Sequence, residues 1–265
     1  MKRVALGMLI VFCMACQSNT PPTLEITGTL KNMSHYLTQH PELGEQQFFI
    51  LSLYEIPFGS NAQPLQIASD TLKQGEINFT LKGLTRSSGL FDIVLENTNL
   101  IIPLVNDRNP LKVDIDLAGA EPEYSVSGSV ASEELKNFIQ AYNSQSLLYS
   151  HSMDSLNRLK QLNAPDSTVL SVTELKNQQL NQLNKFLTDV LEHASNGTVA
   201  TFALGRAAQT LPQDVFEKSL TALTEKFPED ASLEALQKQF EDYKKRSEEH
   251  TSELQSHLNL VCRLL

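Results

Sequence analysis

The sequence predicts an α+β protein in which an antiparallel β-sandwich or partly open barrel is followed by a helical region. Two periodicities support this class, because apolar residues alternate along the first half of the chain and recur every three or four residues along the second half. The two patterns meet between Tyr124 and Gln140, where Gly128 interrupts the last alternating segment and Leu135 begins an apolar stripe. We expect Ser132 to cap the helix that carries this stripe.

The first residues have the composition of an export signal. Lys2 and Arg3 form a short positive region ahead of an apolar run from Val4 to Ala15. That run has the length of a signal peptide and is too short to span a bilayer comfortably. We therefore expect a signal peptide over residues 1–15.

The apolar run ends in a motif that resembles the lipobox of bacterial lipoproteins, in which a small residue precedes a cysteine that is diacylated. Ala15 and Cys16 fit that pattern, whereas Cys13 and Met14 depart from it. We expect lipidation at Cys16 and a polar lipidated tether over residues 16–23. The alternative is a plain signal peptide that contains an incidental cysteine.

Short alternating apolar segments then predict a β domain over residues 24–129. Gly, Pro and Asn punctuate these segments, as is typical of antiparallel sandwiches and barrels. The last segment alternates apolar and charged side chains, which predicts a strand with one solvent-facing side. The apolar sets are Leu24, Ile26 and Leu30; Phe49, Leu51 and Leu53; Ile77, Phe79 and Leu81; Phe91, Ile93 and Leu95; Leu100 to Val105; and Leu111 to Leu117.

Three groups of residues in this domain invite a chemical interpretation, and a structural one explains each better. His35 and His40 lie in a polar segment, Ser34 to Gln47, that we expect to be a loop without a completed ligand set. Asp114 and Asp116 alternate with apolar residues, so the outward face of a strand accounts for both. The stretch Ser127-Gly128-Ser129 lacks the pattern of a nucleophile elbow and is interpreted as a strand end.

Residues 130–245 have the period of amphipathic helices that bury one another. Asn163 to Asp166 separates the first two helices, and Asn196-Gly197 is expected to end the second. Further helices are expected from Phe202, from Pro212 through Phe227, and around a stripe of four apolar residues. That stripe contains Leu233, Leu236, Phe240 and Tyr243.

Composition excludes some classes of partner and site. The net charge is −10 and no basic cluster follows the first residues, so we expect no nucleic-acid partner. The three cysteines are Cys13, Cys16 and Cys262. They form neither a disulfide framework nor a cysteine zinc site. No cofactor and no metal are expected.

The β domain resembles the N-terminal domain of uncharacterised function of TlpA/ResA-type thioredoxin-like thiol:disulfide interchange lipoproteins. The resemblance extends over residues 16–245, because Lys226 to Asp230 and a last helix ending near Lys245 are similar to the stretch that precedes the thioredoxin fold of that family. It implies a membrane anchor at Cys16 and a catalytic cysteine pair downstream, and that pair is absent here. The motifs that carry it are Ile26-Thr27-Gly28-Thr29-Leu30, Leu51-Ser52-Leu53-Tyr54, Gln74-Gly75-Glu76-Ile77-Asn78-Phe79 and Val126-Ser127-Gly128-Ser129.

The last twenty residues, Arg246 to Leu265, resemble the translation of a common short-read sequencing adapter, including its index and the bases that follow. Every position of the segment is compatible with that reading frame. We therefore treat residues 246–265 as an artefact and give no functional weight to the side chains within them, including Cys262.

Two functions agree with these patterns. The first is the non-catalytic N-terminal and linker portion of a membrane-anchored thiol:disulfide oxidoreductase. The alternative is a complete, non-enzymatic envelope lipoprotein that binds a ligand or a protein. Both imply a protein attached to a membrane through its lipid anchor and facing the periplasm of a bacterial cell envelope, with possible protein partners there and no catalytic residues of its own. A hydrolase is the least favoured class.

Overall fold

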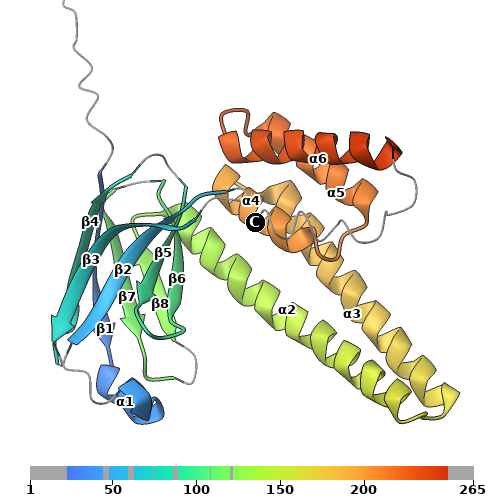
Figure 1. The fold of residues 1–265 in the computed structure, drawn as a ribbon, viewed down its shortest axis with the longest axis horizontal. Coiled ribbons are helices and arrows are strands. Elements are labelled where there is room, and N and C mark those ends of the chain that lie inside the picture. The colour runs from blue at the N-terminus through green and yellow to red at the C-terminus, as the bar shows by residue number, and fades with distance from the viewer. Residues whose placement is uncertain are drawn as a thin grey trace, which may run out of the picture.

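The computed structural model describes residues 23–43, 48–58, 63–73, 75–85, 89–107, 109–119 and 122–249. A two-sheet sandwich forms the N-terminal half and helices form the C-terminal half (Figure 1). The strands are β1 (Thr23–Lys31), β2 (Phe48–Ile56), β3 (Leu65–Lys73), β4 (Asn78–Leu84), β5 (Leu90–Leu95), β6 (Ile101–Val105), β7 (Leu111–Asp116) and β8 (Glu123–Ser127). The helices are α1 (Met33–Gln39), α2 (Val130–Gln161), α3 (Asp166–His193), α4 (Gly197–Ala207), α5 (Gln213–Lys226) and α6 (Ala231–Glu249), with a short 3-10 turn at Pro41–Leu43.

This architecture confirms the predicted α+β class with an open sandwich. One sheet has the strand order β4-β1-β7-β8 and the other has the order β3-β2-β5-β6. The pairing differs from a purely antiparallel sandwich in one place, because β1 and β7 run parallel at the centre of the first sheet. Long connections lie between these two strands, so alternation along each strand could not reveal their relative direction.

The core of the sandwich consists of the residues that alternation selects. Side chains such as Ile26, Leu53 and Phe91 are fully buried between the two sheets. Gly28 is required at the parallel pair, since a Cβ there would lie 1.8 Å from the carbonyl oxygen of Val113. The ring of Phe79 would lie 2.6 Å from the same Cβ, so glycine lets that ring pack over β1.

Two elements of the sandwich differ from the prediction. The segment expected to be a polar loop begins with α1, whose Tyr36 and Leu37 are buried against the sandwich. This helix is too short for its period to stand out from the sequence. The strand β3 was not predicted, because most of its side chains are partly or fully exposed and only Leu72 is buried. An edge strand with two solvated faces gives no alternating signal.

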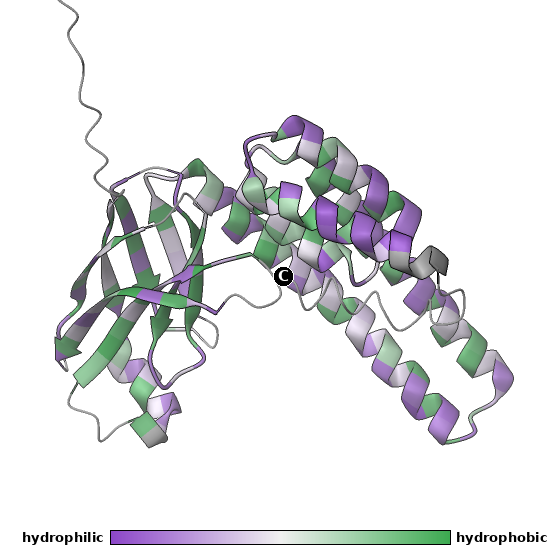
Figure 2. Ribbon diagram, turned by 45° about the horizontal axis from the view of Figure 1, so that its top comes forward, coloured by the Kyte–Doolittle hydropathy of each residue, from purple (hydrophilic) through white to green (hydrophobic). Residues whose placement is uncertain are grey.

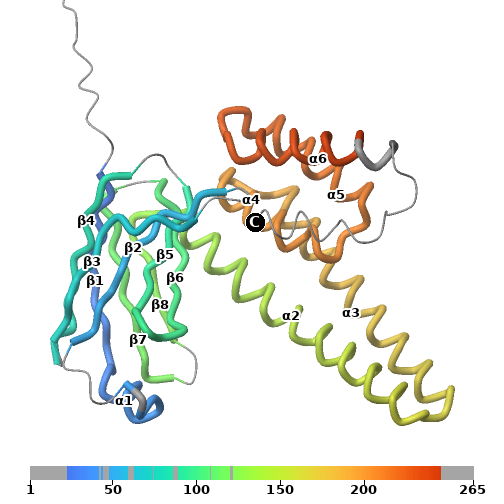
Figure 3. Tube along the Cα trace, in the orientation of Figure 1, coloured from blue at the N-terminus to red at the C-terminus, as the bar shows by residue number. Residues whose placement is uncertain are grey.

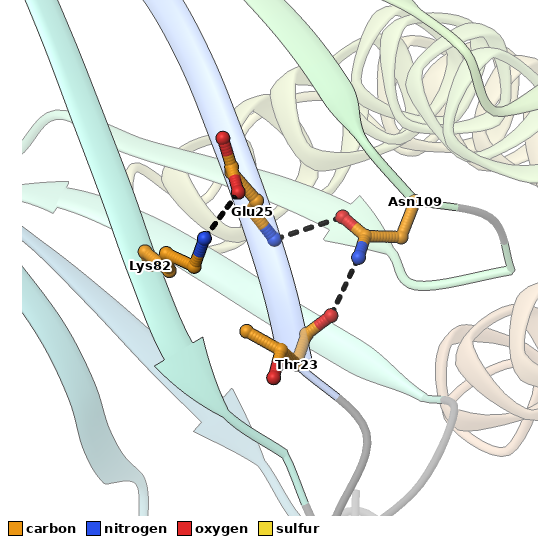
Figure 4. Close-up of polar contacts among 4 residues, drawn as sticks. All are labelled: Thr23, Glu25, Lys82 and Asn109. Atoms are coloured by element: carbon orange, nitrogen blue, oxygen red, sulfur yellow. Dashed lines mark hydrogen bonds and ion pairs between the residues drawn. The ribbon is translucent and has the colours of Figure 1, made fainter.

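The point where the chain enters the sandwich is held by a side-chain clip (Figure 4). The side-chain amide of Asn109 donates to the carbonyl oxygen of Thr23 at 2.6 Å, and its oxygen accepts from the backbone N–H of Glu25 at 2.9 Å. The carboxylate of Glu25 also pairs with Lys82 on β4 at 2.7 Å. Thr23 and Glu25, the first and third residues of β1, are thereby fixed to the β6–β7 connection and to β4.

The helical half confirms the expected succession of amphipathic helices. The long helices α2 and α3 lie side by side and antiparallel, and α4, α5 and α6 cover the end of this pair near the sandwich (Figure 3). Phe138 lies in the core that they share, with its ring stacked on Phe186 at 5.9 Å and edge-on to Phe202 at 6.0 Å. Asn196 does not end α3, which stops at His193; it caps α4 instead, accepting from two backbone N–H groups.

A buried junction connects the two halves of the molecule. Ser129, not Ser132, is the N-cap of α2, since its hydroxyl accepts from the N–H of Ser132 at 2.8 Å. The hydroxyl of Ser132 instead accepts from the N–H of Val105 at 2.9 Å and donates to the carbonyl oxygen of the same residue at 3.0 Å. Val105 lies on β6, an edge strand of its sheet. The start of α2 therefore satisfies backbone groups that a sheet edge would leave unpaired.

We predict that Ser132→Ala lowers the free energy of unfolding by about 1–3 kcal/mol. The substitution leaves the N–H of Val105 buried without its partner, while the carbonyl keeps a hydrogen bond from the hydroxyl of Ser129 at 3.3 Å. One unsatisfied buried group costs about 1–3 kcal/mol. Equilibrium unfolding in urea measures the change. Ser155→Ala, at an exposed position of α2, is the matched control and should change stability by less than about 0.5 kcal/mol. Equal effects of the two substitutions would contradict this account of the junction.

Candidate functional site

The single site residue predicted from the sequence, Cys16, lies outside the described residues. The segments assigned to the signal peptide and to the adapter-derived tail also lie outside them, except that the backbone of α6 continues to Glu249. Lipidation at Cys16 therefore stays a prediction.

A cleft of about 470 Å³ lies where the sandwich meets the helical half. The end of β6 and the residues after it form one wall, including Val105 and Asp107. The start of α4 and the connection between α5 and α6 form the other walls, with Asn196 and Asp230 among their residues. Three helices, α2, α4 and α6, begin near this cleft, and the positive N-terminal ends of helices attract anions where their N–H groups are free.

The polar side chains of this cleft already serve the helix starts. The carboxylate of Asp107 accepts from Ala131 N–H at 3.3 Å, and Asp230 accepts from the N–H groups of Ser232 and Leu233. The other oxygen of Asp230 comes so close to Gly197 that a Cβ there would lie 2.3 Å away. Acidic caps and close packing make this cleft a structural joint between helices rather than an anion site.

Asp114 and Asp116 lie on the outward face of β7, where the alternation pattern places them. Asp114 accepts from the hydroxyl of Thr29 at 2.7 Å, and this bond and the neighbouring Lys112 lower its pKa. Asp116 accepts from the side-chain amide of Asn32 at 2.6 Å, which lowers its pKa as well. Both carboxylates are thus stabilised in the ionised form, whereas a general acid needs a raised pKa. The two carboxylates accept hydrogen bonds that tie β7 to β1 and to Asn32, the residue that follows β1.

A different carboxyl group has the raised pKa. Asp92 on β5 faces outward from its sheet, between its cross-strand neighbours Tyr54 and Pro103. Burial raises the pKa of Asp92 to about 6. Nearby, burial and then the charges of Glu133 and Asp92 raise the pKa of Tyr124 to about 12. The sequence pattern does not single out Asp92, because alternation marks only the apolar positions Phe91, Ile93 and Leu95 of this strand and does not show what covers its outward face.

The surroundings of Asp92 give it no catalytic partner among the described residues. The ammonium group of Lys136 lies 5.6 Å from the centre of the Tyr124 ring, and Glu133 lies on the same helix turn. No serine, cysteine or histidine is recorded in hydrogen-bond contact with the Asp92 carboxylate in the described structure. The arrangement stores an unfavourable buried charge and does not assemble a nucleophile with a base.

The histidines that were weighed as ligands have structural contacts. A ring nitrogen of His35 lies 3.0 Å from the side-chain nitrogen of Gln39, and the ring of His40 lies against Tyr36 with 4.3 Å between the ring centres. Within the described ranges, no group of three or more His, Cys, Asp or Glu side chains has a geometry that could hold a metal ion. None of the helices in those ranges is long and apolar enough to cross a bilayer.

Comparison with known proteins adds no relationship to this geometry. The chain matches no family model and has no significant match among curated proteins.

We predict that Asp92→Asn stabilises the protein at neutral pH and not in acid. The folded-state pKa of about 6 exceeds the reference value of 3.8, so the native state favours the protonated carboxyl. The stability that this proton contributes is complete below about pH 4 and is lost as the pH rises through 6. The substitution should raise the free energy of unfolding by about 2–3 kcal/mol at pH 7.5, since each pKa unit corresponds to about 1.4 kcal/mol.

The matched control for this experiment is Asp114→Asn. Its carboxylate has a lowered pKa, so its ionised form contributes stability above the reference pKa and loses it in acid. Asp114→Asn should therefore lower stability at pH 7.5, in the direction opposite to Asp92→Asn. Urea unfolding of both variants at pH 4 and pH 7.5 tests the two signs. A loss of stability in Asp92→Asn at pH 7.5 would show that the carboxylate has a favourable partner.

Proposed function

We propose that this chain is the non-catalytic N-terminal and linker portion of a membrane-anchored thiol:disulfide oxidoreductase lipoprotein. In this proposal Cys16 carries the lipid anchor, and the protein faces the periplasm of a bacterial cell envelope. The sandwich and the helices act as a spacer that separates the membrane from a thioredoxin domain encoded after Lys245. Its partners are then the membrane and envelope proteins that exchange electrons with that domain.

One observation carries the proposal: the sequence motifs on which the resemblance depends pack against one another or cap a helix in the fold. The motif around Gly28 forms β1, and the motif that ends in Phe79 forms the start of β4 beside it. Phe79 is buried where Gly28 leaves space for its ring. The motif that ends in Ser129 provides the cap of α2. These residues support a shared domain type, since each has a role in packing or capping that a related fold would also need.

The geometry of the described residues supports a spacer rather than a reaction centre. The clip at Asn109 fixes the entrance of the chain into β1, which is where a tether from Cys16 would arrive. The junction at Ser132 fixes the exit from the sandwich into α2. A tethered element that must transmit position needs rigid attachment at both ends. Thiol:disulfide exchange itself needs an attacking thiolate and a resolving cysteine, and the chain has no cysteine between Cys16 and Cys262.

We predict that this chain does not reduce insulin disulfides and that a longer chain does. The longer chain continues after Lys245 with the natural downstream sequence in place of residues 246–265. Insulin turbidity in the presence of dithiothreitol measures the activity, with buffer as the background and thioredoxin as the positive control. The expected result is background turbidity for the short chain and rapid precipitation for the long one.

Either of two outcomes would overturn the oxidoreductase proposal. Reduction of insulin by the short chain would require a reactive thiol that the proposal denies. A natural downstream sequence without a Cys-x-x-Cys pair, or with an immediate stop codon, would favour the non-enzymatic envelope lipoprotein instead.

We also predict that Cys16→Ser abolishes lipidation and signal-peptide-independent membrane attachment. Two or three acyl chains anchor a protein stably, whereas one chain gives marginal binding, so loss of the acylated thiol should release the protein or leave it uncleaved. Fractionation of cells into soluble and detergent-extracted pools measures the change, and Cys13→Ser is the matched control. Equal retention of both variants in the detergent pool, with normal cleavage, would count against lipidation at Cys16.

A further inference from the structure

A small pocket lies where the end of β2 and the start of β5 meet α4. Its sandwich side consists of Ile56, Pro57, Phe58 and Leu90. Leu90 is the cross-strand neighbour of Ile56, so the two strands present one continuous wall. Figure 2 shows hydrophobic residues in both the strands and the helices beside this junction. The pocket is separate from the larger cleft described above, because the two share no lining residue.

The helical side of the pocket comes from α4 and the turn that follows it. Phe202 and Arg206 are four residues apart on α4, so their side chains lie on one face of the helix. Gln209 follows three residues after Arg206 and lines the same pocket. Gly205 also lines it and contributes no side chain. The pocket is therefore open between an aromatic ring and a cation.

The size and lining of the pocket define the apolar part of a ligand. Its volume is about 100 Å³. An apolar cavity of about 150 Å³ holds the six carbons of benzene, so this pocket has room for about four carbon atoms. Leu90 is buried, and Ile56, Phe58 and Phe202 pack around it in one apolar cluster. The pocket accepts a short aliphatic group and is too small for a drug-sized molecule.

The guanidinium group of Arg206 is held in place by aromatic rings and not by an anion. Its central carbon lies 5.3 Å from the centre of the Phe202 ring and 5.6 Å from the centre of the Tyr142 ring. Such contacts restrain a cation without neutralising its charge. The chain has a net charge of −10, so carboxylates are plentiful. Within the described ranges, however, no carboxylate forms an ion pair with Arg206.

This unpaired guanidinium identifies the polar part of the ligand. Guanidinium groups pair most strongly with carboxylates and phosphates, through two parallel N–H···O bonds. Among the described residues that line the pocket, Arg206 alone is charged. One cation balances the single charge of a carboxylate, whereas a phosphate group carries a charge of about −1.5 to −2 at neutral pH. A carboxylate is therefore the better match.

The position of the pocket on α4 makes this attraction depend on one side chain. The helix ends at Ala207, and Arg206 lies in its last turn. The dipole of a helix disfavours anions at its C-terminal end. Attraction for a carboxylate at this place therefore has to come from Arg206 itself.

We propose that this pocket binds a small ligand that consists of a short aliphatic group and a carboxylate. The aliphatic group lies against Ile56, Leu90 and Phe202, and the carboxylate pairs with Arg206. A free short-chain carboxylate and the C-terminal residue of a peptide ending in leucine share this chemistry. The site goes beyond the role of a spacer and depends neither on a thioredoxin domain nor on lipidation.

Titration of the full chain in a mild detergent with isocaproate tests the site, followed by the amide NMR signals of Gly205 and Gln209. We expect saturable shifts with a dissociation constant of about 0.1–10 mM, as is usual for so small a ligand. Isocaproamide lacks the charge and acetate lacks the apolar group. Each should bind about tenfold more weakly or worse, because each keeps only one of the two interactions.

Arg206→Gln tests the cation directly. The variant should bind isocaproate about tenfold more weakly or worse and leave the weak binding of isocaproamide unchanged, since a hydrogen bond to a charged group is lost. Arg158→Gln is the comparison variant, because Arg158 is also exposed in the last turn of its helix, and it should bind isocaproate normally. The circular dichroism spectrum reports whether each variant is folded. The ligand series on the unchanged chain decides the question even if Arg206→Gln does not fold.

N-acetylleucine, which adds a peptide-like amide beside the carboxylate, distinguishes the two sources of the ligand. Tighter binding than that of isocaproate supports the proposal with a peptide C-terminus as the ligand, and weaker binding supports it with a free short-chain carboxylate. Absence of shifts at Gly205 and Gln209 at about 100 mM isocaproate overturns the proposal. Equal affinity for isocaproate and isocaproamide, or undiminished affinity for isocaproate in a folded Arg206→Gln variant, overturns it as well.

Discussion

The structure depends on one exchange of hydrogen bonds between a helix start and a sheet edge. The hydroxyl of Ser132 both accepts from and donates to the backbone of Val105, while Ser129 caps the helix and Val105 completes β6. A β-sandwich followed by helices could otherwise be two units joined by a linker. Here the first turn of α2 is hydrogen-bonded to the edge strand β6, so the sheet edge fixes where α2 starts and restrains its direction.

Apolar packing extends this constraint to the rest of the helical half. Leu90 and Val105 from the sandwich pack with Ala131 and Leu135 from α2 and with Val199 from α4. Asp92 lies on the same strand as Leu90, two residues further on, and its partial burial raises the pKa of its carboxyl. Keeping a charged group at such a position lowers stability, and the surrounding apolar contacts offset that cost. The junction thus combines close apolar packing with a carboxylate whose burial is unfavourable.

Much of this fold could be predicted from the sequence, because burial of one face leaves a period that the residues record. The alternating sets at Leu24 and Leu111 and the stripe at Leu135 gave the sandwich, the helices and the place where they meet. The strand β3 has no consistently buried face and α1 is too short for its period to stand out, and these two reasons explain the errors at both elements. The parallel pairing of β1 with β7 depends on contacts between distant segments, and the role of Ser132 depends on its distance from Val105. The site prediction at Cys16 came from a motif outside the described residues. The raised pKa of Asp92 could not be predicted, because it depends on burial by parts of the chain that are distant in sequence.

Native-state hydrogen exchange on β6 measures the junction most directly. Leu100 and Asn106, which flank β6, are hydrogen-bonded to Leu95 and Gly89 at the two ends of β5. In an antiparallel pair every second residue bonds to the partner strand, so the amides of Ile101 and Val105 both point away from β5. Only Val105 meets a helix, through Ser132. If the account is right, the Val105 amide exchanges only through global unfolding, with a free energy equal to that of the core strands, while the Ile101 amide exchanges much faster. Equally fast exchange of both amides would contradict it.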